Sequence, residues 1–175
     1  HTRRKNLLLR DLDELVNQQL AKMLFANPQR IDYYDRYQEI IDSYNAEQNR
    51  ATIEKTFMDL MELASSLDTE QQRYVREGFS SDEELSVYDL LFSEDLTKQE
   101  IETIKKVSVD LLTKIKQQIA KLDHWTDKQE TKAIVDNLIR NTLWQELPNS
   151  YDVNDIQTYQ KKIYEYVYMR YPEVA

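Results

Sequence analysis

The chain has 175 residues, of which 23 are basic and 32 acidic, so its net charge is −9, and 41% of its residues are hydrophobic. This length fits one domain with a short appendage, and a chain of this size buries a substantial core without covalent cross-links. The absence of cysteine excludes disulfides and thiolate metal sites, and the acidic balance argues against a dedicated DNA-binding domain, which normally carries a positive field.

Helical periodicity runs through the first part of the chain. Residues 4–25 predict a helix whose inward stripe is Leu8, Leu12, Leu15, Val16 and Met23. Asn27 is a candidate N-cap and Pro28 the first helical residue of a second helix, which ends near residue 45. A third helix is predicted over residues 48–67. A further turn or two over residues 69–77 ends at Gly78.

Three capping motifs mark helix starts in the rest of the chain. Each pairs a hydroxyl residue with Glu or Gln three positions later: Ser81 with Glu84, Thr97 with Glu100, and Thr126 with Gln129. They predict a short helix ending near residue 92, a long one reaching residue 122 and a third ending near residue 144. Pro148 then precedes a last helix over about residues 152–170.

These elements predict an all-α fold, an irregular bundle of about seven or eight helices. A weak boundary near residues 45–48 divides it into an N-terminal helical arm of two helices, residues 1–46, and a compact C-terminal helical bundle, residues 47–175. No apolar run approaches the roughly 20 residues of a membrane span, so we expect no membrane partner. The lack of cysteine is consistent with a reducing cytoplasm, the compartment that we expect.

The sequence offers no candidate for a catalytic, cofactor-binding or metal-binding site. A single glycine excludes the glycine-rich loops that hold phosphates. The two histidines, His1 and His124, lie in no zinc-ligand pattern. The carboxylates at residues 82–84 and 32–42 are explained by solvated helix faces and helix starts. We therefore expect neither a cofactor nor a small-molecule substrate for this region.

The two tryptophans bracket the stretch of residues 123–144, and their helical positions differ. Trp125 precedes a predicted helix start, where apolar residues pack back on the first turns, so we expect it to be structural. Trp144 falls nearly opposite the inner face of its helix, four residues after Arg140, which could stack on its ring. Two alternatives stay open for Trp144, which is covered either by the last helix or by a partner.

Two further residues belong to the candidate contact surface. Lys132 lies in a row with Lys128 and Arg140, at the margin of the inner face of the helix. Tyr168 points away from the apolar stripe of the last helix, and exposed aromatic residues are enriched at interfaces. The candidate interface residues are therefore Trp144, Arg140, Tyr168 and, at the rim, Lys132.

Three segments carry a family resemblance: "NPQRIDYYDRYQEIIDSYN" at residues 27–45, "LSVYDLLF" at 85–92 and "HWTDKQETKAIVDNLIRNTL" at 124–143. In this order and spacing, they resemble the C-terminal region of the R (restriction and motor) subunit of type I restriction–modification enzymes. The resemblance implies a parent that is an ATP- and Mg-dependent DNA translocase and site-specific deoxyribonuclease. That parent assembles with methyltransferase (M) and specificity (S) subunits, and it contacts DNA through its other domains.

The resemblance associates this helical region with docking the R subunit on the M and S subunits. We therefore expect a non-catalytic assembly module. The alternative is an accessory element of the translocation motor that contacts DNA through the Lys/Arg row, with an affinity that falls steeply as salt rises.

Overall fold

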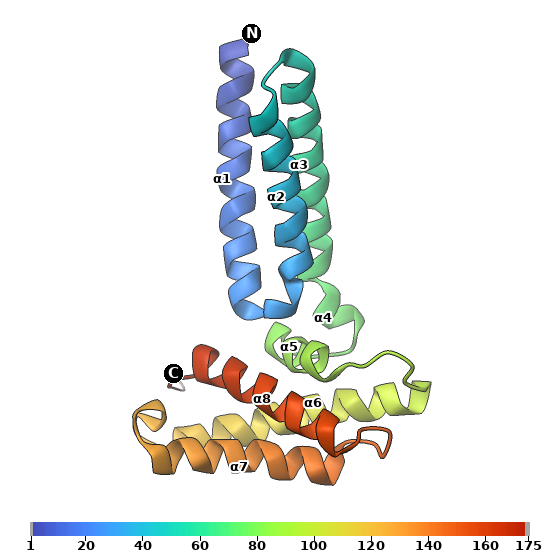
Figure 1. The fold of residues 1–175 in the computed structure, drawn as a ribbon, viewed down its shortest axis with the longest axis vertical. Coiled ribbons are helices and arrows are strands. Elements are labelled where there is room, and N and C mark those ends of the chain that lie inside the picture. The colour runs from blue at the N-terminus through green and yellow to red at the C-terminus, as the bar shows by residue number, and fades with distance from the viewer. Residues whose placement is uncertain (1, 174–175) are drawn as a thin grey trace. The chain divides into compact units, whose positions relative to one another are not determined.

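The computed structural model describes residues 2–173, and within this range it contains eight α-helices, two short 3₁₀ helices and no strand (Figure 1). The predicted all-α fold, with its seven or eight helices, is confirmed. The chain divides into two compact units, residues 1–78 and residues 79–175. Each unit has its own buried side chains and is described by itself.

The first unit is built from three long helices that lie side by side in Figure 1. Its elements are α1 (Thr2–Ala26), η1 (Pro28–Arg30), α2 (Ile31–Ala46), α3 (Arg50–Gln71) and the short α4 (Arg73–Arg76). Helix α3 packs against both α1 and α2. The buried core of this unit comprises Leu9, Val16, Leu20, Met23, Tyr37, Ile53, Leu60, Leu63 and Leu67.

The division of the chain differs from the boundary expected at residues 46 and 47. That position lies between α2 and α3, inside the first unit. The reason is that Leu60, Leu63 and Leu67 of α3 are fully buried in the same core as Val16 and Leu20 of α1. An arm made of α1 and α2 alone would leave this apolar surface in water.

The inward stripe of α1 also differs from the expected one. Leu8 and Leu15 are 51% and 64% exposed, whereas Leu9 and Leu20 are buried. Val16 and Met23 are buried as expected. The buried face of α1 is thus rotated relative to the apolar stripe, because which edge of a stripe is covered depends on where the neighbouring helices pack.

The connection between α1 and α2 is held by a buried polar group. Asn27 accepts a hydrogen bond from the backbone N–H of Gln29, which confirms its capping role. The turn that it caps is the 3₁₀ helix η1, and α2 begins only at Ile31. The Arg30 guanidinium at the end of η1 is buried and donates to the Glu70 carboxylate at 2.8 Å. This ion pair ties the connection to the end of α3.

The second unit consists of α5 (Asp82–Leu91), α6 (Lys98–Ala120), η2 (Trp125–Asp127), α7 (Gln129–Glu146) and α8 (Val153–Arg170). Helix α7 packs against both α6 and α8, and α5 contacts α6 and α8. Thr97 with Glu100 forms the complete capping box of α6, as expected. Ser81 caps α5 as expected, but the box is incomplete, because the Glu84 carboxylate accepts from the backbone N–H of Ser80 and not from that of Ser81. Asp152 and Asp155 form another box at the start of α8.

The expected capping box of Thr126 and Gln129 is wrong. His124 adopts a left-handed conformation with φ 48°, residues 125–127 form η2, and no side chain caps α7. The Thr131 hydroxyl instead donates to the carbonyl oxygen of Trp125 at 2.6 Å. The helix therefore starts later than the sequence suggests, because the preceding turn folds back to bury the Trp125 ring.

Candidate partner interface on helices α7 and α8

The two tryptophans occupy opposite environments in the second unit. Trp125 is completely buried, and its indole Nε1 donates to the carbonyl oxygen of Tyr171 at 2.7 Å. The Tyr164 and Tyr168 rings meet its indole edge-on, with centroids 6.1 and 5.8 Å away. The structural role expected for Trp125 is confirmed.

Trp144 is 50% exposed, and α8 leaves it open to solvent. Arg140, one turn earlier on the same helix, is exposed as well. Neither side chain makes a hydrogen bond, ion pair or ring contact with any other residue that the structure describes. The expected stacking of Arg140 on the Trp144 ring is therefore absent. Both side chains instead lie exposed at the surface of α7.

The side of α7 that carries Trp144 is held in place from within the unit. Val135, Ile139 and Leu143 on its other side are fully buried. Near its end, the Glu146 carboxylate is bound by the Lys114 ammonium of α6 at 3.1 Å. Burial, followed by a hydrogen bond with the neighbouring Asp110 carboxyl, raises the pKa of Glu146. Trp144 is thus presented on a fixed helix rather than on a loop.

Tyr168 and Lys132 lie near the other end of α7. Tyr168 is 38% exposed, and one side of its ring covers Trp125. Lys132 is half-buried. Twelve residues of helix separate Lys132 from Trp144, which is roughly 18 Å at 1.5 Å per residue. The four candidate residues therefore line the length of the α7 and α8 pair and do not form one compact cluster.

A hydrogen bond from Gln160 Nε2 to Asp136 Oδ1, at 3.0 Å, sets the register between α7 and α8. The two helices run in opposite directions, so Lys132, one turn before Asp136, lies level with Tyr164, one turn after Gln160. By the same spacing, Lys128 lies level with Tyr168.

We call Lys128, Lys132, Arg140 and Lys161 the basic strip. By helical spacing from Asp136 and Gln160, which are in contact, these residues fall near the line where α7 and α8 meet. Lys161 was not among the expected interface residues. The sequence signal for it is the spacing of three and four residues that joins it to Gln157, Tyr164 and Tyr168 on one face of the last helix.

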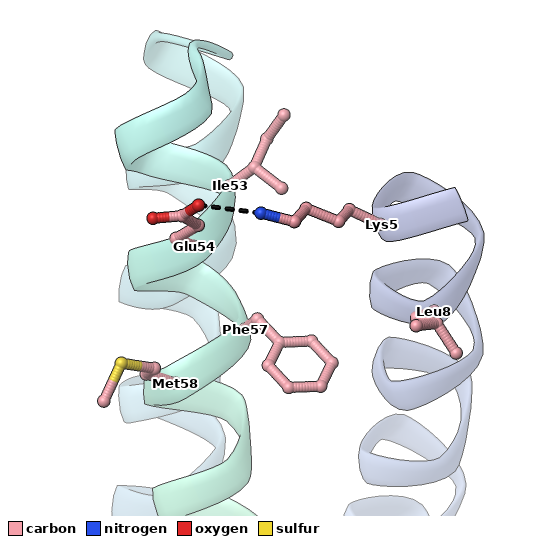
Figure 2. A pocket seen from close by; sticks show the side chains of 6 residues that line it. All are labelled: Lys5, Leu8, Ile53, Glu54, Phe57 and Met58. Carbon is pink, nitrogen blue, oxygen red and sulfur yellow. Dashed lines mark hydrogen bonds and ion pairs between the residues drawn. The ribbon is translucent and has the colours of Figure 1, made fainter. Parts of the chain in front are cut away.

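The first unit carries a separate apolar groove of about 390 Å³ between α1 and α3 (Figure 2). The Lys5 side chain of α1 reaches Glu54 of α3, at 2.8 Å, and Phe57 points into the space below this ion pair (Figure 2). The hydrogen bond from Lys5 is the main cause that lowers the pKa of Glu54. Because its two charged residues neutralise one another, the groove presents no unpaired charge with which to orient a small ligand.

The described residues contain no grouping of three or more His, Asp or Glu side chains that could hold a metal ion. Within residues 2–173, none of the helices combines the length and the apolar character that a membrane crossing requires.

One comparison with known proteins places the chain in a family. Over residues 1–171, the chain matches the family model described as type I restriction enzyme HindI endonuclease subunit-like, C-terminal. No curated protein and no solved structure gives a significant match. The match spans nearly the whole chain and confirms the resemblance carried by the three sequence segments. The chain therefore belongs to the family of C-terminal regions of type I restriction enzyme HindI-like endonuclease subunits.

Proposed function

We propose that this helical region is a non-catalytic assembly module, which docks the R subunit of a type I restriction enzyme on its methyltransferase and specificity subunits. The observation that carries the proposal is the exposure of Trp144 on a helix whose other face is fixed in a core. In this proposal, the ATP- and Mg-dependent translocation and the DNA cleavage belong to other parts of the parent subunit.

The side of α7 that faces solvent has the composition of a contact surface. Trp144 and Arg140 belong to the two residue types that most often dominate binding energy at interfaces. Around them lie Ala133, Asn137 and Asn141, which are exposed, small or uncharged. A partner that covers this surface buries the Trp144 ring together with these uncharged neighbours, so it does not pay the cost of desolvating charged side chains at these three positions.

The test is the affinity of the complete R subunit for the purified complex of M and S subunits. Truncating a central aromatic anchor commonly costs about 2 kcal/mol, so Trp144→Ala should weaken binding about 30-fold. Met169→Ala is the matched control, because Met169 is an exposed apolar side chain of the same unit, 70% exposed against 50% for Trp144, on the outer side of α8. It should bind like the wild type.

Two results would count against the proposal. Unchanged binding of a correctly folded Trp144→Ala variant would remove this residue from the interface. An R subunit that lacks the whole region and still binds the M and S subunits with wild-type affinity would refute the docking function itself.

The basic strip supports a second candidate, contact with duplex DNA by the translocation motor. Its four cations could neutralise phosphates, and each phosphate contact makes the affinity fall more steeply with salt. Titrating the 175-residue chain with duplex DNA at low salt tests this candidate, and an absence of binding would reject it for this region.

A further inference from the structure

We propose that the basic strip steers the docking of this region, and that the partner surface opposite it is an acidic protein surface. This inference rests on the proposed docking function and specifies the chemistry of the partner. The strip supplies attraction at long range, and Trp144 supplies the apolar anchor once the surfaces meet.

The four cations of the strip are unpaired. The side-chain cations of Lys128, Lys132, Arg140 and Lys161 make no hydrogen bond or ion pair with the residues that the structure describes. By contrast, Lys114 and Lys116 of the neighbouring helix α6 are both engaged by carboxylates, at 3.0 Å and 2.6 Å. The chain has nine more acidic than basic residues, and yet these four cations have no carboxylate partner within it. We therefore expect their carboxylate partners to belong to another protein.

The acidic residues near the strip form no ion pair with its cations in the part of the chain that the structure describes. Asp136 lies within the strip, but its carboxylate already accepts the hydrogen bond from Gln160. Glu165 lies one turn from Lys161, on the solvent side of α8. Glu130 lies two residues before Lys132, and two helical residues point in nearly opposite directions. Four cations thus lie near four carboxylates, counting Asp127 directly before Lys128, and what distinguishes these cations is that no carboxylate of the described residues engages any of them.

The geometry favours an acidic protein over a nucleic acid. The strip ends at Trp144, whose ring is half-exposed. An apolar pocket in a protein surface can bury such a ring, whereas the phosphate backbone of a duplex offers no such pocket. Tyr164 and Tyr168 lie along the same line and add rigid aromatic area typical of protein interfaces.

The experiment measures association and dissociation rates of the complete R subunit with the complex of M and S subunits, over a series of salt concentrations. The test variant combines Lys128→Gln, Lys132→Gln and Lys161→Gln, and it leaves Arg140 and Trp144 intact. The control variant removes three other exposed lysines of the same unit, with Lys98→Gln, Lys106→Gln and Lys121→Gln, and therefore has the same net charge.

Rim and steering charges act mainly on the association rate. The strip variant should associate at least about tenfold more slowly at low salt, with a flatter salt dependence and a nearly unchanged dissociation rate. The control variant should follow the wild type. Equal association rates for the two variants would overturn the inference. The inference would also be overturned if the strip variant docked like the wild type but lost affinity for duplex DNA, because the strip would then bind a nucleic acid.

Trp144→Ala, measured in parallel, separates this inference from the proposed function. If Trp144→Ala weakens binding and the strip variant associates like its control, the docking function stands and the steering role fails. If neither variant changes binding, both proposals fail.

Discussion

The indole N–H of Trp125 donates to the carbonyl oxygen of Tyr171 at 2.7 Å, across 46 positions of sequence. This bond joins the turn before α7 to the residue after α8. The bond therefore joins one end of α7 to one end of α8, the two helices that carry the candidate interface. The same ring lies against Tyr164 and Tyr168, so the packing of Trp125 also fixes two aromatic residues beside the basic strip.

Trp125→Ala should destabilise the chain strongly. Removing a fully buried tryptophan leaves a cavity and typically costs about 3 to 5 kcal/mol, and here the carbonyl of Tyr171 also loses its donor. Urea denaturation followed by circular dichroism measures the free energy of unfolding. Trp144→Ala serves as the control and should stay within about 0.5 kcal/mol of the wild type, as is usual for an exposed side chain. Similar unfolding midpoints for the two variants would contradict this account of Trp125.

The ion pair of Arg30 and Glu70 should make the first unit sensitive to acid. Burial by itself would raise the pKa of Glu70, but hydrogen bonds from Arg73 and Arg30 outweigh it, so the pKa is lowered. A carboxyl whose pKa is lower in the folded chain contributes its full stability above its ordinary value of 4.5 and loses it as the pH falls through the folded value.

Glu70→Gln tests this ion pair, because it removes the carboxylate that pairs with the buried Arg30 guanidinium. Breaking a buried pair costs about 3 kcal/mol or more near neutral pH. The variant should also lose less stability than the wild type on acidification below pH 4.5, which denaturation curves at several pH values would detect. Glu54→Gln removes a carboxylate of the same helix from an exposed ion pair, and it should change stability little. A neutral-pH stability of Glu70→Gln equal to that of Glu54→Gln would refute the assignment.

Much of the fold follows from local patterns in the sequence. The box of Thr97 and Glu100 and the N-cap Asn27 were predictable because capping depends on residues three or fewer positions apart. What could not be predicted depends on tertiary packing. The period of α1 indicates an apolar stripe, but only the positions of α2 and α3 decide that Leu9 is buried and Leu8 is not. The division of the chain after residue 78 likewise depends on where α3 packs.

The candidate interface was predictable in its parts but not in its arrangement. The helical angle of Trp144 indicated a position opposite the core, and the ring is indeed half-exposed. The contact of Tyr168 with Trp125 was not foreseeable, because it joins segments that are distant in sequence. The register of α7 against α8, which places Lys161 in the basic strip, depends in the same way on one contact between Asp136 and Gln160.

Alkaline pH should destabilise the chain through its buried tyrosines. Burial is the main cause that raises the pKa of Tyr37, with a further rise from its hydrogen bond to Asp13, and burial likewise raises the pKa of Tyr151. Above the ordinary tyrosine value of 10.0, the unfolded chain loses these protons first. The free energy of unfolding should therefore stay nearly constant as the pH rises to about 10, and it should decrease at higher pH.

Tyr151→Phe isolates one of these groups. The Tyr151 hydroxyl donates to the carbonyl oxygen of Leu91 at 2.5 Å, so the variant should lose about 1 kcal/mol at neutral pH. Its stability should then fall less steeply than that of the wild type between about pH 10 and 11.5, because one titrating group is gone. Tyr34→Phe, at an exposed position, is the control. Parallel alkaline curves for Tyr151→Phe and the wild type would contradict the prediction.

Gly78→Ala should destabilise the chain through the backbone alone. Gly78 follows α4 with φ +86°, a left-handed conformation, and its N–H donates to the carbonyl oxygen of Val75 at 3.0 Å. A Cβ added there would meet no atom within 4 Å, so no steric clash with a neighbour contributes. The expected cost is therefore the intrinsic one, about 1 kcal/mol, and Gly78→Asn should cost less because asparagine tolerates this conformation better. Urea denaturation of the two variants gives the order of stability directly. Equal stabilities for Gly78→Ala and the wild type would mean that the residue can change to a negative φ at no cost, and that the turn after α4 is not fixed by its glycine.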